Sequence, residues 1–348
     1  ATDDDREGEA IAWHICRIAK LPTATTKRII FHEITETAIK QAVANPTIID
    51  MKKVHAQLGR QVLDRLVGYT ISPTLWTSDK NNKLSAGRCQ TPALRLVYDN
   101  QLEIDKEPGK RAFETTGYFL KDDLDFQLNK EFEKEEEIDN FLEETVNFDH
   151  KITEKPKIKK TEKKAPTPFS TSLLQQRASN ELKFSPKQTM QVAQKLYEGG
   201  HITYMRTDNK RYSKEFIEDC VNFIKNKWSV GENYIKKDLD SIMLGNNKKS
   251  KGAQEAHEAI RPTKLTFTGE ALEDFREKKL YYLIWTNTIE SCMANAIFDV
   301  ITLNISAPLN CIYRRSEENI VFLGWMIVKN ILKDYSLFKY IKSLQKQE

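Results

Sequence analysis

Apolar residues at helical spacing mark the first third of the chain. Ile11, Ile15 and Ile18 recur every three or four positions, which predicts a helix that begins at Glu9. The same period predicts three further helices, at 37–44, 50–69 and 93–100. The longest of them is expected to bury an apolar stripe that includes Val54, Leu58 and Leu66. A short strand is predicted between the first two helices, at 28–33.

From Arg111 onward, apolar and polar residues alternate in short segments, which is the period of a β-strand. Strands are predicted at 112–120, 125–128, 299–306, 311–314 and 320–323. Between them the helical period returns, with helices predicted at 170–182, 186–198, 213–228 and 270–298. Pro186 at a first helical position and Gly199-Gly200 at the end of the same helix are typical of helix boundaries. The lysine-rich run at 151–164 is interpreted as a strand entering a linker.

The order of these elements predicts a mixed α/β fold of several domains. The chain leaves a β-rich layer, builds a helical domain and then returns to strands. Two helices followed by a strand, around 168–208, resemble a winged-helix module, a common nucleic-acid binder. The polar residues 246–252 are predicted to form a loop. The predicted domains are 1–49, 50–108, 109–165, 166–294 and 295–348.

The overall composition excludes several classes of protein. The 348 residues are 39% apolar and 30% charged, which is typical of a globular chain with two or three domains. We find no apolar run long enough to span a bilayer and no signal-like start, so a cytoplasmic (nucleoid-associated) or nuclear protein is expected. A strand is expected to precede Ala1, so the start is expected to be truncated. The five scattered cysteines include no Cys-x-x-Cys pair, which favours reduced thiols over a zinc ribbon.

The run from His201 to Asp208 carries the strongest chemical signal. If it is extended, Tyr204, Arg206 and Asp208 share one face, because side chains alternate along a strand. A phenol is a weak nucleophile that needs activation, and a guanidinium can hold a phosphate and offset developing charge. The set therefore suits attack of a tyrosine on a phosphodiester. A core tyrosine beside a surface arginine is the alternative.

Three carboxylates alternate at the start of the chain. Asp3, Asp5 and Glu7 would point the same way at the end of a strand, where they would repel one another and raise their own pKa values. A hard cation such as Mg²⁺, bound through oxygen, would resolve that conflict. A solvated acidic loop is the alternative.

His257 and Arg261 lie four residues apart, so within one helical turn they would share a face. Pro262 limits the turn to a short one. The run His-Glu-x-x-Arg lacks the second histidine of a metalloprotease His-Glu-x-x-His site. Binding of a phosphate and a purely structural pair both stay open for these two side chains.

Four separated runs now occur together and in one order. They are Asp3-x-Asp5-x-Glu7-Gly8-Glu9, Leu84-Ser-Ala-Gly-Arg88-x-Gln90, Tyr204-Met-Arg206-Thr-Asp208 and His257-Glu-Ala-Ile-Arg261-Pro-Thr. Together they resemble the type IA DNA topoisomerases, the bacterial topoisomerase I branch most of all, over nearly the whole chain. The first run is shared with other Toprim proteins, whereas the last two together are highly specific.

The resemblance implies a Toprim remnant, a helical DNA-binding segment, a β-arch, and an inserted winged-helix-like domain that carries the catalytic tyrosine. It implies an enzyme that cleaves one DNA strand through a 5′-phosphotyrosine, reseals it, and relaxes negatively supercoiled DNA without ATP. The absence of a Gly-x-x-x-x-Gly-Lys-Ser/Thr loop agrees with ATP independence. The implied partner is single-stranded or negatively supercoiled DNA, with no membrane partner and a monomeric enzyme.

The resemblance also implies roles for particular residues. Tyr204 would be the nucleophile, Arg206 would stabilise the scissile phosphate, and His257 would support the catalytic site. Asp3, Asp5 and Glu7 would hold Mg²⁺, which is needed chiefly for resealing. The positions expected near bound DNA are Arg28, Arg60, Asp64, Arg88, Ser170, Thr171, Gln175, Asp208 and Arg261.

Two departures from the family pattern are visible. Asn209 stands where the family usually has serine, and Gln61 stands where bacterial members often have a second arginine beside a pocket that reads an upstream base. Two other functions stay open on the sequence. The chain could be a catalytically incomplete fragment that binds single-stranded DNA, or another Toprim enzyme such as a primase or nuclease.

Overall fold

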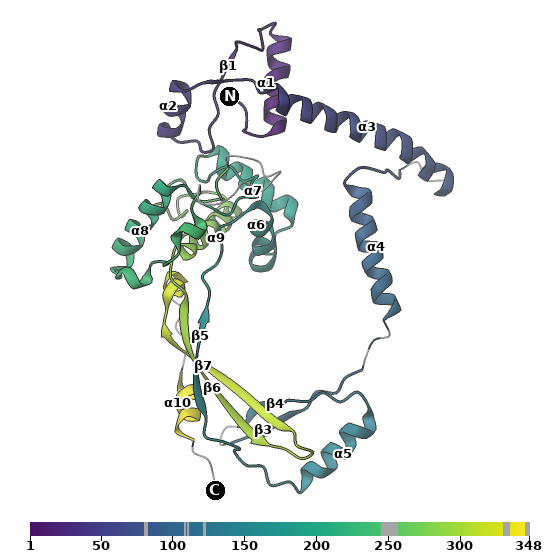
Figure 1. Ribbon diagram of the computed structural model, residues 1–348, viewed down its shortest axis with the longest axis vertical. Coiled ribbons are helices and arrows are strands. Elements are labelled where there is room, and N and C mark those ends of the chain that lie inside the picture. The colour runs from purple at the N-terminus through teal and green to yellow at the C-terminus, as the bar shows by residue number, and fades with distance from the viewer. Residues whose placement is uncertain are drawn as a thin grey trace. The chain divides into compact units, whose positions relative to one another are not determined.

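The computed structural model describes residues 1–79, 83–107, 109, 111–120, 123–244, 257–329 and 335–344. The loop predicted at 246–252 lies outside these residues. The chain forms two compact units (Figure 1). The first contains 1–108, 169–211 and 247–284, and the second contains 109–168, 212–246 and 285–348.

The first unit begins with helices that pack around a small core. Helix α1 (Arg6–Ile18) packs against α3 (Met51–Asp79), and Cys16, Ile49 and Val54 are buried between them. Helix α2 (Glu36–Ala44) lies between two short strands, β1 (Lys27–Arg28) and β2 (Thr47–Ile48), which pair antiparallel. The strand predicted at 28–33 is therefore only two residues long, because the following residues lie beside the Tyr204 segment instead of in a sheet.

Helices α3 and α4 are longer and more exposed than the sequence predicted. Helix α3 continues past Tyr69 and through Pro73, and α4 (Gln90–Lys106) begins three residues before the predicted start. The prediction for Leu66 is wrong, because its side chain is exposed. Ile11, Ile15 and Ile18 of α1 are exposed as well. All residues of α4 are at least partly exposed, so helical periodicity here does not mark a buried face.

The remainder of the first unit is built from a second group of helices. Helix α6 (Thr171–Arg177) continues into a π-helical turn, Ala178–Leu182, and α7 (Pro186–Glu198) follows. Ser170 is the N-cap residue of α6, and Gly199, at the predicted end of α7, is the C-cap residue of that helix. Gly200 has a φ of +72° and lies against the Ile34 carbonyl, which a side chain would overlap.

The second unit is organised around an antiparallel sheet of five strands in the order β3-β4-β7-β6-β5 (Figure 1). The strands are β3 (Thr116–Phe119), β4 (Leu124–Leu128), β5 (Lys157–Lys163), β6 (Ala296–Ser306) and β7 (Ile312–Phe322). Helices α5 (Glu135–Val146) and α10 (Ser336–Ser343) supply Phe141 and Phe338 to a core shared with Phe126 and Tyr313. The lysine-rich β5 is an edge strand, which agrees with a charged, unpaired outer side.

Three further findings concern boundaries. Helix α8 (Lys214–Trp228) is capped by Ser213 as predicted. Helix α9 (Phe275–Ser291) stops before Ala296, so the helix predicted to reach residue 298 is too long. Strand β7 is continuous where two short strands were predicted. The mixed α/β fold is confirmed, whereas the five-domain division stays a prediction.

Candidate active site

Tyr204 lies in an extended segment that is held from several sides. The structure forms no regular strand at 201–208, so that prediction is wrong. The Tyr204 N–H instead donates to the His32 carbonyl at 2.9 Å, and the Thr203 N–H donates to the Arg261 carbonyl at 2.9 Å. The Thr171 hydroxyl donates to the Met205 carbonyl at 2.7 Å. Because separate parts of the chain fix this backbone, the tyrosine has a defined position without belonging to a sheet.

The Asp5 carboxylate, from the acidic run at the start of the chain, contacts the side chains of Tyr204 and Arg206. Its Oδ2 accepts a hydrogen bond from the Tyr204 hydroxyl at 2.7 Å and one from Arg206 Nη1 at 3.4 Å. Its Oδ1 accepts from the Gly8 N–H at 2.7 Å and thereby caps α1. Gly8 is required there, because an added Cβ would lie 2.1 Å from the Asp3 carbonyl oxygen.

These contacts set the protonation of the tyrosine and the aspartate. Burial raises the pKa of the Tyr204 phenol far above its ordinary value, and the hydrogen bond to Asp5 raises it further, while Arg206 partly offsets both. Burial also opposes ionisation of Asp5, but the hydrogen bonds from Gly8, Tyr204 and Arg206 hold its pKa below the usual range. The resting state is therefore a neutral phenol that donates to an ionised carboxylate.

The candidate metal ligands Asp3, Asp5 and Glu7 do not share one environment. Burial and then the Asp5 charge raise the pKa of Asp3, which is the electrostatic conflict that a divalent cation would relieve. Glu7 instead accepts from Gln57 at 3.0 Å and pairs with Arg60 at 3.3 Å. Both oxygens of Asp5 and both oxygens of Glu7 already accept from protein donors, so Asp3 is the carboxylate of the three whose electrostatic conflict a cation would relieve most directly.

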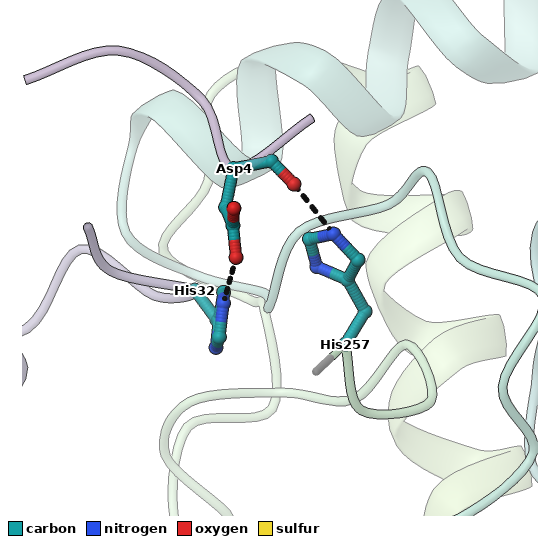
Figure 2. Close-up of side chains that lie close together, drawn as sticks. All are labelled: Asp4, His32 and His257. Carbon is teal, nitrogen blue, oxygen red and sulfur yellow. Dashed lines mark hydrogen bonds and ion pairs between the residues drawn. The ribbon is translucent and has the colours of Figure 1, made fainter. Parts of the chain in front are cut away.

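A second polar cluster, which includes Asp4, His32 and His257, is shown in Figure 2. Asp4 Oδ2 is 2.8 Å from His32 Nε2, and Asp4 Oδ1 accepts from Lys53 Nζ at 3.0 Å. The His257 Nε2–H donates to the Asp4 backbone carbonyl at 2.6 Å, and the His257 ring centroid is 5.3 Å from that of Tyr204. Burial, and then the neighbouring His32, lower the pKa of His257, so the imidazole is neutral. His257 therefore lies beside the tyrosine ring, and its supporting role in the catalytic site stays a prediction.

The extended backbone at 257–263 explains why the helical turn predicted for His257 and Arg261 is wrong. Ile260 and Pro262 form bridges with Phe169 and Ile202, so the segment pairs like a strand. Arg261 is buried and forms ion pairs with Glu258 at 2.7 Å and Glu33 at 3.2 Å. Its contacts hold three segments of the first unit together.

Arg28 is also enclosed by protein contacts. Its guanidinium pairs with Glu9 at 3.0 Å, with the two side chains 3% and 2% exposed, and it donates to the Asp3 carbonyl at 2.8 Å. The backbone that carries the carboxylates is therefore held by Arg28. These contacts give the residue a positioning role in this structure.

The predicted DNA-facing residues of the helical segment lie together on an exposed surface. Arg88 forms two hydrogen bonds to Asp64, at 2.7 and 3.3 Å. Arg60 and Asp64 line a cavity of about 530 Å³, together with Gln61, Tyr69 and other residues of α3 and the loop at 85–86. These side chains can rearrange around a ligand, because their ion pairs are exposed to solvent.

The remaining predicted residues divide into two groups. Ser170 is buried, with its hydroxyl 3.3 Å from that of Ser172, and Thr171 braces the 205–207 backbone. Gln175 is half-buried and Asp208 is exposed.

Three residues of the second polar cluster were not predicted from the sequence, namely Asp4, His32 and Lys53. A count of alternate positions treats Asp4 as a spacer between Asp3 and Asp5. A hydrophobic-to-polar transition at Phe31-His32 was the only local signal for the histidine.

Two further expectations concern cysteines and membranes. The structure forms no disulfide among the five cysteines, all of which lie in described residues, and their reduced state stays a prediction. In the part of the chain that the structure describes, every helix is too short or too polar to cross a lipid bilayer.

Comparisons with known proteins agree on one family. The profile of a DNA topoisomerase family matches residues 48–347. DNA topoisomerase 1 of Campylobacter jejuni is 41% identical over 354 aligned positions, covering 93% of this chain and 48% of that protein. The crystal structure of full-length topoisomerase I from Thermotoga maritima superimposes with a TM-score of 0.77 at 35% identity, covering 95% of this chain and 55% of that one. The chain spans about half the length of these relatives.

Proposed function

Because this chain belongs to the type IA DNA topoisomerases, we propose that Tyr204 transiently cleaves one DNA strand and that the protein relaxes negatively supercoiled DNA without ATP. One observation carries the proposal. The Tyr204 hydroxyl and the Arg206 guanidinium meet at the same oxygen of Asp5, at 2.7 and 3.4 Å. A buried nucleophile, a cation and an acceptor for its proton are thus within contact of one another.

Tyr204 and Arg206 differ in their exposure to solvent, and this difference suits two different roles. Tyr204 is 3% exposed, so its ring is fixed by packing, with Tyr197 at 5.3 Å between ring centroids. The side chain of Arg206 is 55% exposed and remains accessible to a phosphate. A phosphate that approaches Arg206 would therefore arrive beside the tyrosyl oxygen, which is held in place by its bond to Asp5.

The proposed step is a transesterification. The Tyr204 oxygen forms a bond to phosphorus while its proton passes to the Asp5 carboxylate, and the bond from phosphorus to the 3′ oxygen breaks as that oxygen takes up a proton from water. Asp5 then returns its proton to the solvent. The products are a 5′-phosphotyrosine and a free 3′-hydroxyl. Arg206 offsets the charge that develops on the phosphate. Attack by the 3′-hydroxyl reverses the step, and no ATP is required because one phosphodiester replaces another.

Mg²⁺ is the cofactor that we propose for resealing. Asp3, Asp5 and Glu7 are the residues that would hold it, and Asp5 and Glu7 would first have to give up some of their contacts to protein donors. When bound, the cation would offset the charge of the phosphate and the carboxylates. Arg28, through its bond to the Asp3 carbonyl, would keep the two aspartates in position.

Two cavities are proposed to receive the DNA. One of about 900 Å³ is lined by Asp3 and Arg206 and also by the cationic side chains Lys187, Lys195 and Arg276. The other is the 530 Å³ cavity along α3, where Arg60 contributes positive charge and Tyr69 an aromatic ring. Cations that follow a backbone and rings that stack on bases are the usual means of holding single strands. Arg60 and Arg88 are therefore proposed as DNA contacts.

A covalent adduct would test the cleavage proposal directly. A single-stranded oligonucleotide labelled at its 3′ end would be incubated with the chain and denatured, and the labelled protein would be mapped by peptide mass. We expect the label on Tyr204 and its loss in Tyr204→Phe, with binding of the oligonucleotide retained by the variant. An adduct that persists in Tyr204→Phe would exclude Tyr204 as the nucleophile.

Tyr197→Phe is the matched control, because Tyr197 is a buried tyrosine in contact with the Tyr204 ring. It should form the adduct. If the chain binds the oligonucleotide but neither protein forms an adduct, the chain by itself is a binding unit and cleavage requires residues beyond it. Where an adduct does form, the cofactor proposal predicts that Mg²⁺ added before denaturation releases the label from the protein as resealed DNA.

A further inference from the structure

A cluster beside Tyr204 contains the ligand types that transition metals prefer. Asp4, His32 and His257 each offer one ligand atom, and these atoms lie within 4.8 Å of one another. The three side chains converge from separate segments of the first unit (Figure 2). Asp4 falls between the alternating carboxylates Asp3 and Asp5, so the Mg²⁺ proposal does not use it.

His257 is oriented as metal-bound histidines usually are. Its Nε2–H donates to the Asp4 backbone carbonyl at 2.6 Å, which fixes the proton on Nε2 and leaves a lone pair on Nδ1. A ligating histidine commonly donates its other ring N–H to a carbonyl or carboxylate in this way. In this structure the same residue, Asp4, supplies both the orienting carbonyl and a candidate ligand.

His257 Nδ1 is buried and has no hydrogen-bond partner among the residues that the structure describes. The whole side chain is only 2% exposed. Figure 2 shows Nδ1 on the side of the ring that is turned toward the Asp4 carboxylate and His32. An acceptor atom without a partner is costly inside a protein, so this lone pair favours an additional group at that position.

We propose that Asp4, His32 and His257 form a binding site for a transition-metal ion such as Zn²⁺, separate from the Asp3–Asp5 pair. Two nitrogen ligands and one carboxylate are a common donor set for zinc, with a fourth position left for water. Mg²⁺ prefers oxygen ligands, so the two clusters differ in the ion that they select.

Formation of the site requires small movements. Asp4 Oδ2 and His32 Nε2 are already 2.8 Å apart, and two ligands on a tetrahedral zinc ion are separated by about 3.3 Å. The His32 side chain is 32% exposed, so it is the ligand with room to move. Lys53 Nζ, 3.0 Å from Asp4 Oδ1, opposes a second cation, and its 39% exposed side chain can turn to solvent.

Metal binding can be measured without any DNA reaction. Co²⁺ would be titrated into the metal-free chain and its visible absorption recorded, followed by competition with Zn²⁺. We expect one ion per chain with the spectrum of nitrogen and oxygen ligands. Asp4→Asn and His32→Asn should each weaken Zn²⁺ binding at least about tenfold, since loss of even an outer partner of a ligand has effects of that size. Lys53→Gln should tighten binding.

Two control variants show whether the metal binds at this cluster or elsewhere on the chain. His14→Asn removes an exposed histidine on α1 and should leave affinity unchanged. Asp3→Asn should also leave the Co²⁺ spectrum unchanged, because Asp3 belongs to the other cluster. Unchanged Zn²⁺ affinity in folded Asp4→Asn and His32→Asn, or displacement of Co²⁺ by millimolar Mg²⁺, would overturn the proposal. Circular dichroism would show that each variant is folded.

Discussion

The centre around Tyr204 and the surface of helices α3 and α4 both carry ion pairs, but they use them differently. Around Tyr204 the arginines Arg28 and Arg261 are buried and bonded to protein groups on several sides. On α3 and α4, Arg60 and Arg88 pair with carboxylates at the surface. The buried cations hold the segments that position Tyr204, whereas the exposed cations can exchange a carboxylate for a ligand.

The physical reason is the cost of holding a charge away from water. A buried charge that loses its partner is left without solvation, so the pair is difficult to separate. An exposed pair contributes about 0–1 kcal/mol, because water and salt compete with it. The sequence places arginine in all four positions, and only the environment decides which of them can contact DNA. Substitutions at matched positions can therefore break or sharpen the contrast.

The largest effect is expected for Arg28→Ala. Removal of this guanidinium leaves Glu9 buried without its ionic partner, and loss of one member of a buried pair costs about 3–5 kcal/mol. Arg60→Ala is the matched change in an exposed pair and should cost at most about 1 kcal/mol. Urea unfolding of both variants would measure the difference. Equal losses of stability would remove the distinction between the two regions.

Asp5→Ala is expected to have the next largest effect on stability. It removes the N-cap of α1, at about 1 kcal/mol, and leaves the buried Tyr204 hydroxyl without an acceptor, at about 1–3 kcal/mol. Removal of the Asp5 charge also relieves its repulsion with Asp3, which offsets part of this loss of stability. Asp64→Ala, which breaks the exposed pair with Arg88, should leave the free energy of unfolding nearly unchanged, because water and salt already compete with that pair.

The same two variants separate the regions by activity. Asp5→Ala should lower the rate of adduct formation on a saturating oligonucleotide, because Tyr204 loses its positioning contact. Asp64→Ala should change the oligonucleotide concentration needed for half-saturation more than the saturated rate. An Asp5→Ala variant that cleaves at the parental rate would show that the Tyr204–Asp5 bond is not part of the reacting arrangement.

Local features of the fold could be predicted from the sequence. The start of α7 at Pro186 and its end at Gly199-Gly200 depend on neighbouring residues, and the structure has them where they were expected. The continuation of α3 through Pro73 could not be predicted, because proline inside a helical pattern is a stop signal unless the surroundings overrule it. The exposure of Leu66 could not be predicted either, because helical periodicity does not reveal whether another element covers the apolar face of the helix.

The candidate site was predictable in composition and not in arrangement. The motifs identified Tyr204, Arg206 and Asp5, but their contacts join positions 199 and 201 residues apart. Alternation placed Asp208 beside them, yet that residue is exposed and the segment is not a strand. Asp4 illustrates the limit most clearly, because a pattern of alternate carboxylates treats it as a spacer while the fold surrounds it with two histidines and a lysine.

The smallest effect, and the one most specific to the surface of α3 and α4, is expected for Arg88→Ala. If Arg88 exchanges Asp64 for a phosphate, its removal should lower affinity for single-stranded DNA a few-fold and reduce the slope of log K against log salt by about 0.7. The free energy of unfolding should stay nearly unchanged, because the pair is exposed. Fluorescence anisotropy at several salt concentrations would measure the slope. Lys40→Ala, which breaks an exposed pair on α2, is the control. An unchanged slope in Arg88→Ala would mean that Arg88 remains paired with Asp64 when DNA binds, and the exposed region would then resemble the buried one.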